Sequence, residues 1–455
     1  MIIEGQGSVS TSRSDLDGLP PGVWRYRAFL PEIPGEDVVT LGEGATPLLQ
    51  AERLGDELGL SHLLLKDESR NPTGSFLDRG STVLVSLASG SGVRECACVT
   101  TGNLGASLAA YCAKANISAH VRVNPNTDQG KLFQMLAYGA KVEASSSSSF
   151  GRNAGPRDLA VTAANTYLLE GEKTTGFEIV QELGWKCPDV VVVPVGTGGH
   201  LTMIWRSLLQ MRAAGILDQS SCRLLGVRLE EARIQGTSAP GGNREALYRS
   251  SQLVELGESE HFFVAEAERS MAESGGAEIT TTRSQTLAAT GLLARTEGIF
   301  AEPSSASVVA CLGQAIRSGQ IGRGDRVVCV ITGAGLKDTR AVSRLARQTR
   351  KVALREDLAM HSPTIGETKL AILRLLRRGP GYGYEIWLLL RSSRRISTAS
   401  VYQHLSELEE LLLVRRRGFV VSKGRERVVY DLTKKGVDLL KMMDRLGLPS
   451  RSRRQ

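Results

Sequence analysis

The sequence predicts an open α/β body followed by a smaller, basic module of three helices and a hairpin. Between Thr46 and Thr339, short β-branched runs alternate with amphipathic stretches of helix length, which is typical of a parallel sheet covered by helices. After Pro363 the pattern changes to three helical stretches and two alternating runs. The charge divides at the same place, since residues 361–455 contain 20 Lys and Arg against 9 Asp and Glu, whereas residues 1–360 contain 36 against 39. This asymmetry favours a nucleic-acid-binding module, with a solvated basic tail as the alternative.

Five apolar runs are expected to form the strands of the body, and four amphipathic stretches are expected to form its crossover helices. The strands are predicted at residues 97–101, 119–123, 190–195, 223–229 and 327–332. The helices are predicted at residues 104–115, 130–138, 176–183 and 284–297. In a fold of this class, ligands bind at the carboxyl ends of the strands.

The same patterns divide the chain into four parts. An N-terminal extension is expected over residues 1–40, the α/β body over 41–345, a linker over 346–365 and the basic module over 366–455. The stretch 341–361 is rich in Arg and Ser and predicts a terminal helix that runs into the linker. The serine run at 145–149 predicts a flexible loop.

The composition excludes several classes of protein. With 455 residues, 41% hydrophobic and 23% charged, the chain is neither disordered nor fibrous. No apolar run reaches the roughly 18 residues of a membrane span, and the first ten residues lack a signal-peptide pattern, so a cytoplasmic location is expected. Seven cysteines favour reduced thiols over a disulfide framework. No metal site is expected.

Three glycine-containing turns follow predicted strands. Residues 196–200 (GTGGH) lie between a strand and a helix, where backbone N–H groups and the helix N-terminus suit a phosphate. Residues 101–107 (TGNLGAS) form a second such turn, in which Asn103 is either an amide donor to a ligand or an ordinary helix N-cap. Residues 332–335 (TGAG) form a third. Because the carboxyl ends of parallel strands share one edge, we expect the three turns to meet at one site.

Several longer motifs resemble those of threonine synthases. They are GVWRY at 22–26, LGEGATPL at 41–48, KDESRNPTGSF at 66–76, EGEKT at 170–174, EPSSA at 302–306 and TGAGLKD at 332–338. The resemblance covers about residues 20–340 and implies the fold type II architecture that binds pyridoxal 5′-phosphate (PLP). It further implies that the cofactor phosphate is held by Gly196, Thr197, Gly198, Gly199 and His200. It assigns the cofactor ring to Phe76, Asn103 and Thr332, and the substrate to Ser75, Thr101 and Gly102.

One departure removes the central group of that chemistry. In the family, the PTGSF segment continues with the lysine that forms the Schiff base with PLP, whereas this chain has Leu77. Leucine has no amine and cannot form the bond or return protons to a substrate carbon. The flanking Asp78 and Arg79 are retained, which argues against a shifted alignment. No catalytic residue is therefore assigned, and the chain is not expected to be an active enzyme. A sequencing or cloning artefact at position 77 is the alternative.

Further departures agree with lost chemistry. His200 stands where an asparagine is usual and Ala334 where a histidine is usual, and residues 228–233 and 145–157 do not follow the family. We expect a site that binds a ligand without turning it over. The ligand could be PLP held non-covalently, an amino acid such as threonine, or a phosphorylated homoserine-like metabolite.

In the basic module, residues 397–412 are expected to form a recognition helix. The expected buried face holds Tyr402, Leu405, Leu408 and Leu412. Candidates for contact with bases on the polar face are Ser397, Thr398 and Gln403. Candidates for phosphate contact, before the helix and at the hairpin tip, are Arg394, Arg395, Lys423, Arg425 and Arg427.

Further motifs identify the module as similar to PadR-type winged-helix transcription regulators. They are GYGYEI at 381–386, SVYQHL at 400–405, LE at 408–409 and VYDLT at 429–433. The resemblance covers about residues 366–446. It departs at 411–413, where a turn glycine is usual, and in the short last helix. A basic module that only oligomerises the body is the alternative.

The sequence leads to three functional hypotheses. The first is a homodimeric, ligand-responsive transcription regulator, in which a degenerate threonine-synthase-like body senses a small metabolite and the winged helix binds DNA. The second is a working PLP-dependent threonine synthase that converts O-phosphohomoserine with a substitute amine and carries an accessory domain. The third is an inactive partner that stabilises an active paralogue.

Overall fold

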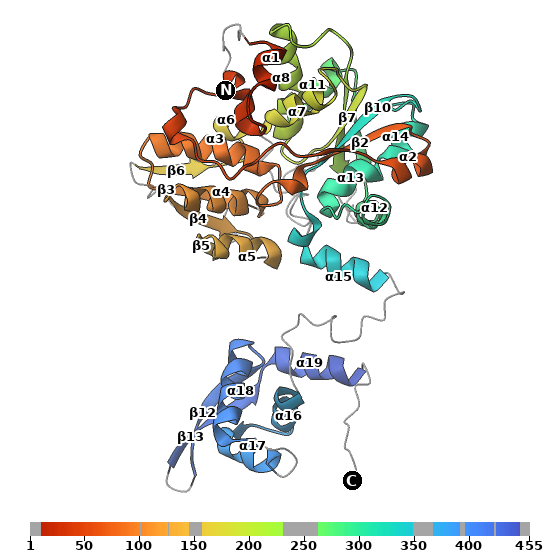
Figure 1. Ribbon diagram of the computed structural model, residues 1–455. Coiled ribbons are helices and arrows are strands. Elements are labelled where there is room, and N and C mark those ends of the chain that lie inside the picture. The colour runs from red at the N-terminus through yellow and green to blue at the C-terminus, as the bar shows by residue number, and fades with distance from the viewer. Residues whose placement is uncertain are drawn as a thin grey trace, which may run out of the picture. The chain divides into compact units, whose positions relative to one another are not determined.

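The computed structural model describes residues 11–100, 102–125, 127–144, 157–230, 263–348, 367–391, 396–422 and 425–445. It divides into two compact units, Met1–Thr349 and Arg350–Gln455 (Figure 1), and each is considered by itself. No helix among the described residues is long and apolar enough to cross a membrane.

The first unit contains two sheets. The larger has the order β1-β2-β10-β7-β8-β9, in which β1 is antiparallel to β2 and all other pairs are parallel. Its strands are β1 (Leu48–Gln50), β2 (His62–Asp67), β7 (Val190–Pro194), β8 (Arg223–Leu229), β9 (Ala277–Thr281) and β10 (Arg326–Ile331). The smaller sheet, β5-β4-β3-β6, is entirely parallel. Its strands are β3 (Glu95–Thr100), β4 (Ser118–Val123), β5 (Lys141–Ala144) and β6 (Asp158–Val161).

Helices cover both faces of the larger sheet, and the alternation of side chains along β7 shows why. Val190 and Val192 face a core built with α2 (Glu52–Leu58), α12 (Arg283–Thr296), α13 (Pro303–Ala310) and α14 (Leu312–Arg317). Val191 and Val193 face a second core built with α1 (Arg13–Asp17), α7 (Thr174–Glu182), α8 (Gly199–Ala213) and α11 (Val264–Glu273). A strand buried on both faces reads as a continuous apolar run, as VVVV does here.

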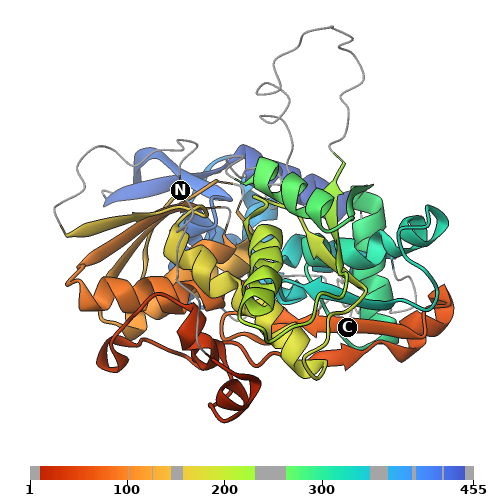
Figure 2. The same cartoon turned by 90° about the horizontal axis from the view of Figure 1, so that it is seen from above.

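The smaller sheet and the helices packed on it form what we call the small subdomain, and the rest of the first unit is the large subdomain. Cys98 and Val121 point into the core beneath α3 (Leu77–Gly90), α4 (Asn103–Lys114) and α5 (Gln129–Ala137). Helix α6 (Thr166–Glu172) packs against α3. From above, the two sheets lie side by side, with the smaller in orange and gold (Figure 2).

Short 3₁₀ helices and one late helix complete the described part of the first unit. They are η1 (Val23–Phe29), η2 (Gly35–Asp37), η3 (Glu68–Arg70), η4 (Gly335–Lys337) and α15 (Thr339–Gln348). Residues 11–40, the described part of the predicted N-terminal extension, contribute to the core of the first unit, because Leu16, Tyr26 and Phe29 are fully buried against α7 and α8.

All five strands and four helices predicted from the sequence are confirmed to within one or two residues at their ends. The sequence patterns did not identify β1, β2, β5, β6 or β9. The serine run at 145–149 and the segment 349–366 lie outside the described residues.

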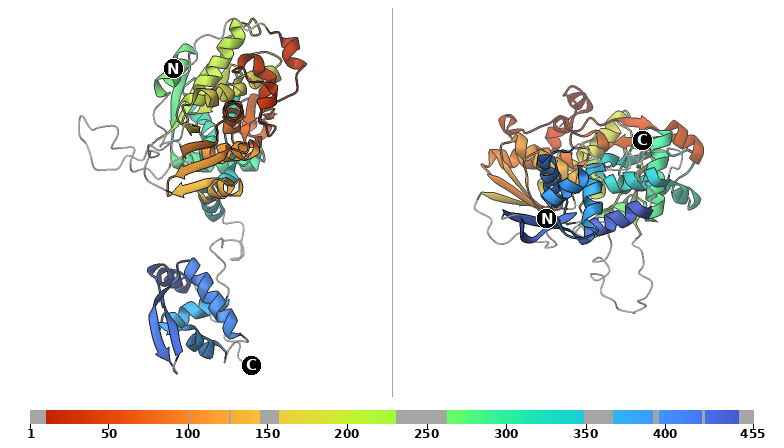
Figure 3. Two further views of the ribbon diagram at one scale, coloured as in Figure 1. Left: turned by 90° about the vertical axis from the view of Figure 1, so that its left-hand side faces the viewer. Right: turned by 90° about the horizontal axis from the view of Figure 1, so that it is seen from below.

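The described residues of the second unit have the expected order of three helices and a hairpin, followed by one further helix. Its helices are α16 (Glu367–Leu376), α17 (Gly383–Leu390), α18 (Thr398–Glu410) and α19 (Lys434–Arg445). Its antiparallel sheet has the order β11-β13-β12, with β11 (Gly381–Tyr382), β12 (Val414–Ser422) and β13 (Arg425–Leu432). The hairpin lies along one side of the helices (Figure 3). This is the winged-helix arrangement.

The predicted buried face of α18 is confirmed at Leu405 and Leu408 and was wrong at Tyr402 and Leu412. Val401, Leu405 and Leu408 are fully buried, whereas Tyr402 is 40% exposed and Leu412 is 66% exposed. Tyr402 lies against Gly383, where a Cβ would come within 2.5 Å of the ring. Leu412 follows the end of the helix and takes φ +57°, so it leaves the helical face and Leu413 turns into the core in its place.

Candidate functional site

The three glycine turns come from the carboxyl ends of β3, β7 and β10, and side chains link the first to the third. Asn103, the first residue of α4, donates from Nδ2 to Oε2 of Glu302 at 2.8 Å. A Cβ at Gly333 would lie 2.4 Å from the same oxygen. The backbone N–H of Glu302 donates to the carbonyl of Gly333 at 3.0 Å. Glu302 therefore joins these two turns.

The segment before Leu77 is held on the third turn. Ser75 forms an antiparallel bridge with Gly333, and the N–H of Phe76 donates to the carbonyl of Thr332 at 3.1 Å. Phe76 then stacks on His200, with ring centroids 4.1 Å apart and planes 13° from parallel. This stack brings the turn at 196–200, after β7, to the same site. The expectation that the turns meet is therefore confirmed.

The loop at 196–199 has the form of an anion cradle. Gly198 has φ +89°, and a Cβ there would lie 2.4 Å from the carbonyl oxygen of Phe263, so only glycine fits. Helix α8 begins at Gly199 and directs its N-terminus at the loop. Within the described part of the chain, the N–H groups of Gly196, Thr197 and Gly198 have no hydrogen-bond partner. This cradle fits a phosphate group such as that of PLP.

Two predicted ring contacts are placed at the other turns. Oδ1 of Asn103 is buried and has no partner among the described residues, so an acceptor is left beside the site. The hydroxyl of Thr332 lies 2.8 Å from the hydroxyl of Ser305, and either can donate. Gly102 has φ +139° and leaves space for the side chain of Lys131. A Cβ added at Gly102 would be 2.3 Å from Cδ of Lys131. Thr101, predicted to contact substrate, lies outside the described residues.

His200 is buried in a way that keeps it neutral. Its Nε2 lies 3.1 Å from the hydroxyl of Thr175, and Nδ1 has no partner in the described structure. Burial lowers the pKa of His200 to about 3. At neutral pH the ring therefore offers no positive charge to a phosphate, and it contributes a flat surface against Phe76.

Leu77 is the first residue of α3, and its half-buried side chain packs against the core of the small subdomain. Its N–H lies 3.4 Å from the Ser75 hydroxyl. The side chain of the next residue, Asp78, is buried and accepts from the Thr73 N–H at 2.6 Å and the Thr73 hydroxyl at 2.7 Å. Asp78 thus fixes the loop that carries Ser75 and Phe76.

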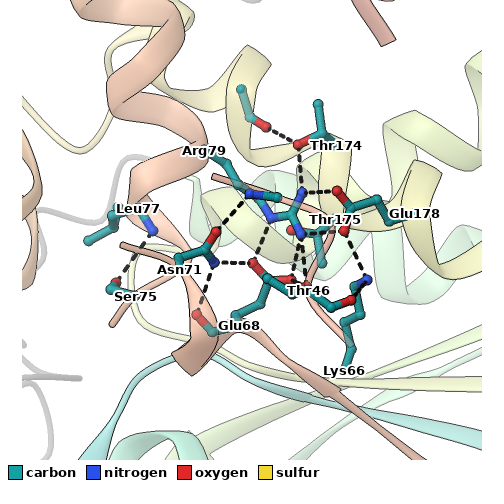
Figure 4. Close-up of polar contacts among 12 residues, drawn as sticks. Thr46, Lys66, Glu68, Asn71, Ser75, Leu77, Arg79, Thr174, Thr175 and Glu178 are labelled. Carbon is teal, nitrogen blue, oxygen red and sulfur yellow. Dashed lines mark hydrogen bonds and ion pairs between the residues drawn. The ribbon is translucent and has the colours of Figure 1, made fainter. Parts of the chain in front are cut away.

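Arg79 is fully buried between two carboxylates (Figure 4). It donates to Glu68 through Nε at 2.6 Å and Nη2 at 2.8 Å, and to Glu178 through Nη1 at 2.8 Å and Nη2 at 2.6 Å. Lys66 lies 2.9 Å from Glu178. Although burial opposes ionisation, Arg79 and Lys66 hold the pKa of Glu178 below its ordinary value. Every member of this cluster is paired, which is the condition under which buried charge is tolerated.

Four buried lysines lie near the site in sequence or in space, and each has a partner. Lys66 donates to the carbonyl of Thr46 at 2.6 Å, Lys131 lies 3.1 Å from Glu302, and Lys173 pairs with Glu170. Lys337 was not singled out from the sequence, although it belongs to the TGAGLKD motif. It donates to the carbonyl of Thr73 at 2.9 Å, and burial lowers its pKa to about 8. Lys337 is thus a buried amine beside the loop that precedes Leu77.

In the second unit, the candidate DNA-contact residues have different surroundings. Ser397 caps α18 by accepting from the Ser400 N–H, Thr398 begins the helix, and Gln403 is exposed on it. Arg427 lies over the rings of Tyr382 in β11 and Tyr384 in α17, 5.4 and 4.7 Å from their centroids, so its guanidinium is held against these two elements. Arg425 begins β13, while Arg394, Arg395 and Lys423 lie outside the described residues.

The sequence reasoning passed over one basic group that the structure makes prominent. Arg415, Arg416 and Arg417 are consecutive on β12, and their side chains are 60–66% exposed. Three adjacent arginines on a predicted strand of the wing would have indicated this exposed basic group from the sequence.

Comparison with known families agrees with the architecture of each unit. Residues 39–333 match the family described as pyridoxal-phosphate dependent enzyme, and residues 372–442 match the transcriptional regulator PadR-like family. The first unit is therefore an α/β protein of the PLP-binding class. The chain belongs to the PLP-dependent enzyme family, in the branch that includes the threonine synthases, and carries a PadR-like domain at its carboxyl end.

The relatives include threonine synthases from archaea and bacteria. That of Methanocaldococcus jannaschii is 36% identical over 344 residues, covering 73% of this chain and 84% of the relative. That of Methanosarcina acetivorans is 35% identical over 384 residues, covering 81% and 93%. That of Mycobacterium leprae is 37% identical over 328 residues, covering 70% and 89%.

Solved structures support the fold. An O-ureido-L-serine synthase has a TM-score of 0.51 at 20% identity and covers 69% of this chain and 96% of its own. The processed form of threonine deaminase isoform 2 from Solanum lycopersicum has a TM-score of 0.51 at 18% identity and covers 77% and 100%. The expected fold type II architecture is confirmed by these neighbours.

Proposed function

We propose that this protein is a ligand-responsive transcription regulator, in which the first unit binds a small metabolite without turnover and the second binds DNA. The observation that carries the proposal is Leu77, which occupies the position of the reactive lysine inside an otherwise ordered site. A basic winged helix on the same chain supplies an output for a binding event.

PLP, held without a covalent bond, is the ligand that the first unit fits best. Gly196, Thr197 and Gly198 would hold its phosphate through their free N–H groups, and Phe76, Asn103 and Thr332 would surround its ring. When bound to an amine, PLP withdraws electrons from a substrate carbon. Leu77 supplies no such amine, so this chain's residues would bind and orient the cofactor. An amino acid or a phosphorylated homoserine-like metabolite could share the site.

Helix α15 contacts both subdomains of the first unit, and the chain continues from it to the second unit. Asp128, at the start of α5 in the small subdomain, accepts from the Thr339 N–H at 3.1 Å, the Thr339 hydroxyl at 3.0 Å and the Arg340 N–H at 3.3 Å. Further along α15, Leu345 lies against Gly291 of α12 in the large subdomain. A Cβ added at Gly291 would be 3.3 Å from Cδ2 of Leu345. A ligand that changes the spacing of the subdomains would therefore displace α15, the last described element before the second unit.

Two measurements on the full chain test the proposal. PLP binding is followed by absorption and thermal denaturation, because saturation at 100 times Kd stabilises the folded state by about 2.7 kcal/mol. Gly198→Ala should abolish this binding, because its Cβ meets the Phe263 carbonyl, whereas Gly275→Ala introduces a positive-φ alanine with open space around it and should retain binding. DNA binding is followed across salt concentrations, with and without PLP, threonine and O-phosphohomoserine. DNA binding no stronger than that of a generic basic protein would refute the regulator.

Lys337 favours a second candidate function, an active threonine synthase with a substitute amine. An amine with a pKa of about 8 is partly neutral at physiological pH and can act as a nucleophile. Release of phosphate from O-phosphohomoserine by the wild type, lost in Lys337→Met and kept in a variant of the exposed Lys141, would favour this candidate over the regulator.

A further inference from the structure

One residue on the exposed face of α18 is suited to form hydrogen bonds with a DNA base. Val401, Leu405 and Leu408 are buried, so the helix presents its other side to solvent. In the first two turns, the exposed positions are Ala399, Tyr402 and Gln403. Gln403 alone among these three carries an amide, which can pair with the N6 and N7 atoms of adenine in a major groove.

The amide of Gln403 is held in one orientation by a neighbouring carboxylate. Its Nε2 donates to Oε1 of Glu407 at 3.1 Å, one helical turn further along. Hydrogen bonds from Lys369 and then His404 lower the pKa of Glu407 to about 2, so at neutral pH this carboxylate is ionised and only accepts hydrogen bonds. The amide nitrogen, and not its oxygen, must therefore face Glu407.

Glu407 is itself anchored from another helix. Lys369 on α16 lies 2.7 Å from Oε2 of Glu407, and Nδ1 of His404 lies 3.3 Å from the same oxygen. Side-chain exposure falls along this chain of contacts, from 34% at Glu407 to 18% at Lys369. The anchor therefore lies on the side of α18 that packs against α16 (Figure 1).

We propose that Glu407 is a positioning residue that fixes the amide of Gln403 for recognition of an adenine. With one N–H engaged by Glu407, the second N–H and the oxygen of Gln403 remain for the adenine N7 acceptor and N6 donor. Glu407 acts through Gln403 and does not touch the base. The inference rests on the proposed function, because it requires that α18 enters a groove of DNA.

The test starts by selecting duplexes bound by the full-length protein from a pool of random DNA. The wild type should enrich a site with an A·T pair whose replacement by G·C weakens binding roughly 5- to 150-fold, the value of one bidentate contact. Gln403→Ala should lose this preference. Glu407→Gln, whose amide can donate as well as accept, should lose most of it and keep the affinity for non-specific DNA and its salt dependence.

A matched control and a double variant separate positioning from a structural role. Glu409→Gln makes the same change on the same helix, where Glu409 pairs with Arg416 at 3.1 Å, and should keep the A·T preference. The double variant Gln403→Ala/Glu407→Gln should discriminate no worse than Gln403→Ala alone. The melting temperature of each variant shows whether the second unit is folded.

The outcomes are distinguishable. A wild type that enriches no sequence refutes DNA recognition itself, and the inference falls with it. A wild type that enriches a site refutes the inference alone if Gln403→Ala keeps the A·T preference, or if folded Glu407→Gln keeps it while Gln403→Ala loses it.

Discussion

Replacing Leu77 with lysine tests whether the missing amine is the only part of the covalent site that this chain lacks. In Leu77→Lys the new amine is attached at the first residue of α3, directly after Phe76. If the cradle at 196–199 and the ring contacts hold PLP as we propose, the amine should reach the aldehyde of the bound cofactor. We expect PLP to become attached through position 77, whereas the wild type binds it reversibly.

The cost of this substitution is small enough for the protein to remain folded. Full burial of a leucine side chain contributes about 1.5–3 kcal/mol, and Leu77 is half-buried, so about 1 kcal/mol is lost. A cation in the first turn of a helix costs roughly 0.3–1 kcal/mol more. A total of about 1–2 kcal/mol is tolerable for a unit whose described residues form three large cores. Partial burial at position 77 also favours the neutral, reactive form of the amine.

The assay is borohydride reduction after incubation with PLP, followed by peptide mass spectrometry. Leu77→Lys should carry a reduced pyridoxyl phosphate group at position 77 far more often than at Lys141, whose side chain is 70% exposed. Leu77→Met controls for the change in packing. Equal labelling of position 77 and Lys141 in a folded variant would show that PLP does not bind where we place it. Selective labelling of Lys337 in the wild type would support the second candidate function.

Four further predictions concern stability and local order. Arg79→Met leaves Glu68 and Glu178 buried without their partner and should cost about 3–5 kcal/mol in urea unfolding of the first unit; a loss below 1 kcal/mol would contradict the buried cluster. Leu412→Gly should raise the unfolding free energy of the second unit by about 0.5–1 kcal/mol, because φ is +57° and the side chain is exposed, and Leu412→Ala should not. Neutral His200, with a folded pKa of about 3 against about 6.5 when unfolded, contributes stability that is complete above pH 6.5 and lost as the pH falls, by roughly 1.4 kcal/mol per unit between pH 6 and 3; His200→Asn should flatten this slope. Asp128→Asn should speed hydrogen exchange at Thr339 and leave that of the β7 amides unchanged.

Much of the fold could be predicted because its strands are buried on both faces. The apolar runs of β7, β8 and β10 are hard to place anywhere but in a covered parallel sheet, and their ends were correct to one or two residues. The strands β1, β5 and β6 are short, and β1 and β5 are largely exposed, so they leave little periodic signal. Their pairing depends on neighbours distant in sequence.

The sequence predicted the glycine turns of the site. It did not predict the contacts that long side chains make between these turns. The left-handed backbone at Gly198 and the close approach at Gly102 demand glycine, and that demand is visible in the sequence. The stack of His200 on Phe76 and the bond from Lys337 to the carbonyl of Thr73 join residues more than 120 apart, and no local pattern predicts them. The error at Leu412 has a local cause, because the left-handed turn at this residue breaks the helical period that the prediction extended through it.

The two residues after Leu77 explain how the site can keep its shape without an amine at position 77. Asp78 ties the loop at Thr73 to Ser107, and Arg79 pairs with Glu68 and with Glu178 of α7, so both side chains hold segments of the first unit together. Neither contact involves position 77. A reactive lysine there would contribute chemistry and little to the fold, because the α3 helix is already fixed by its next two residues. Under the proposed function, a chain without this amine binds its ligand without turnover and still has the cradle at 196–199, the ring of Phe76 and the contacts of α15 with both subdomains.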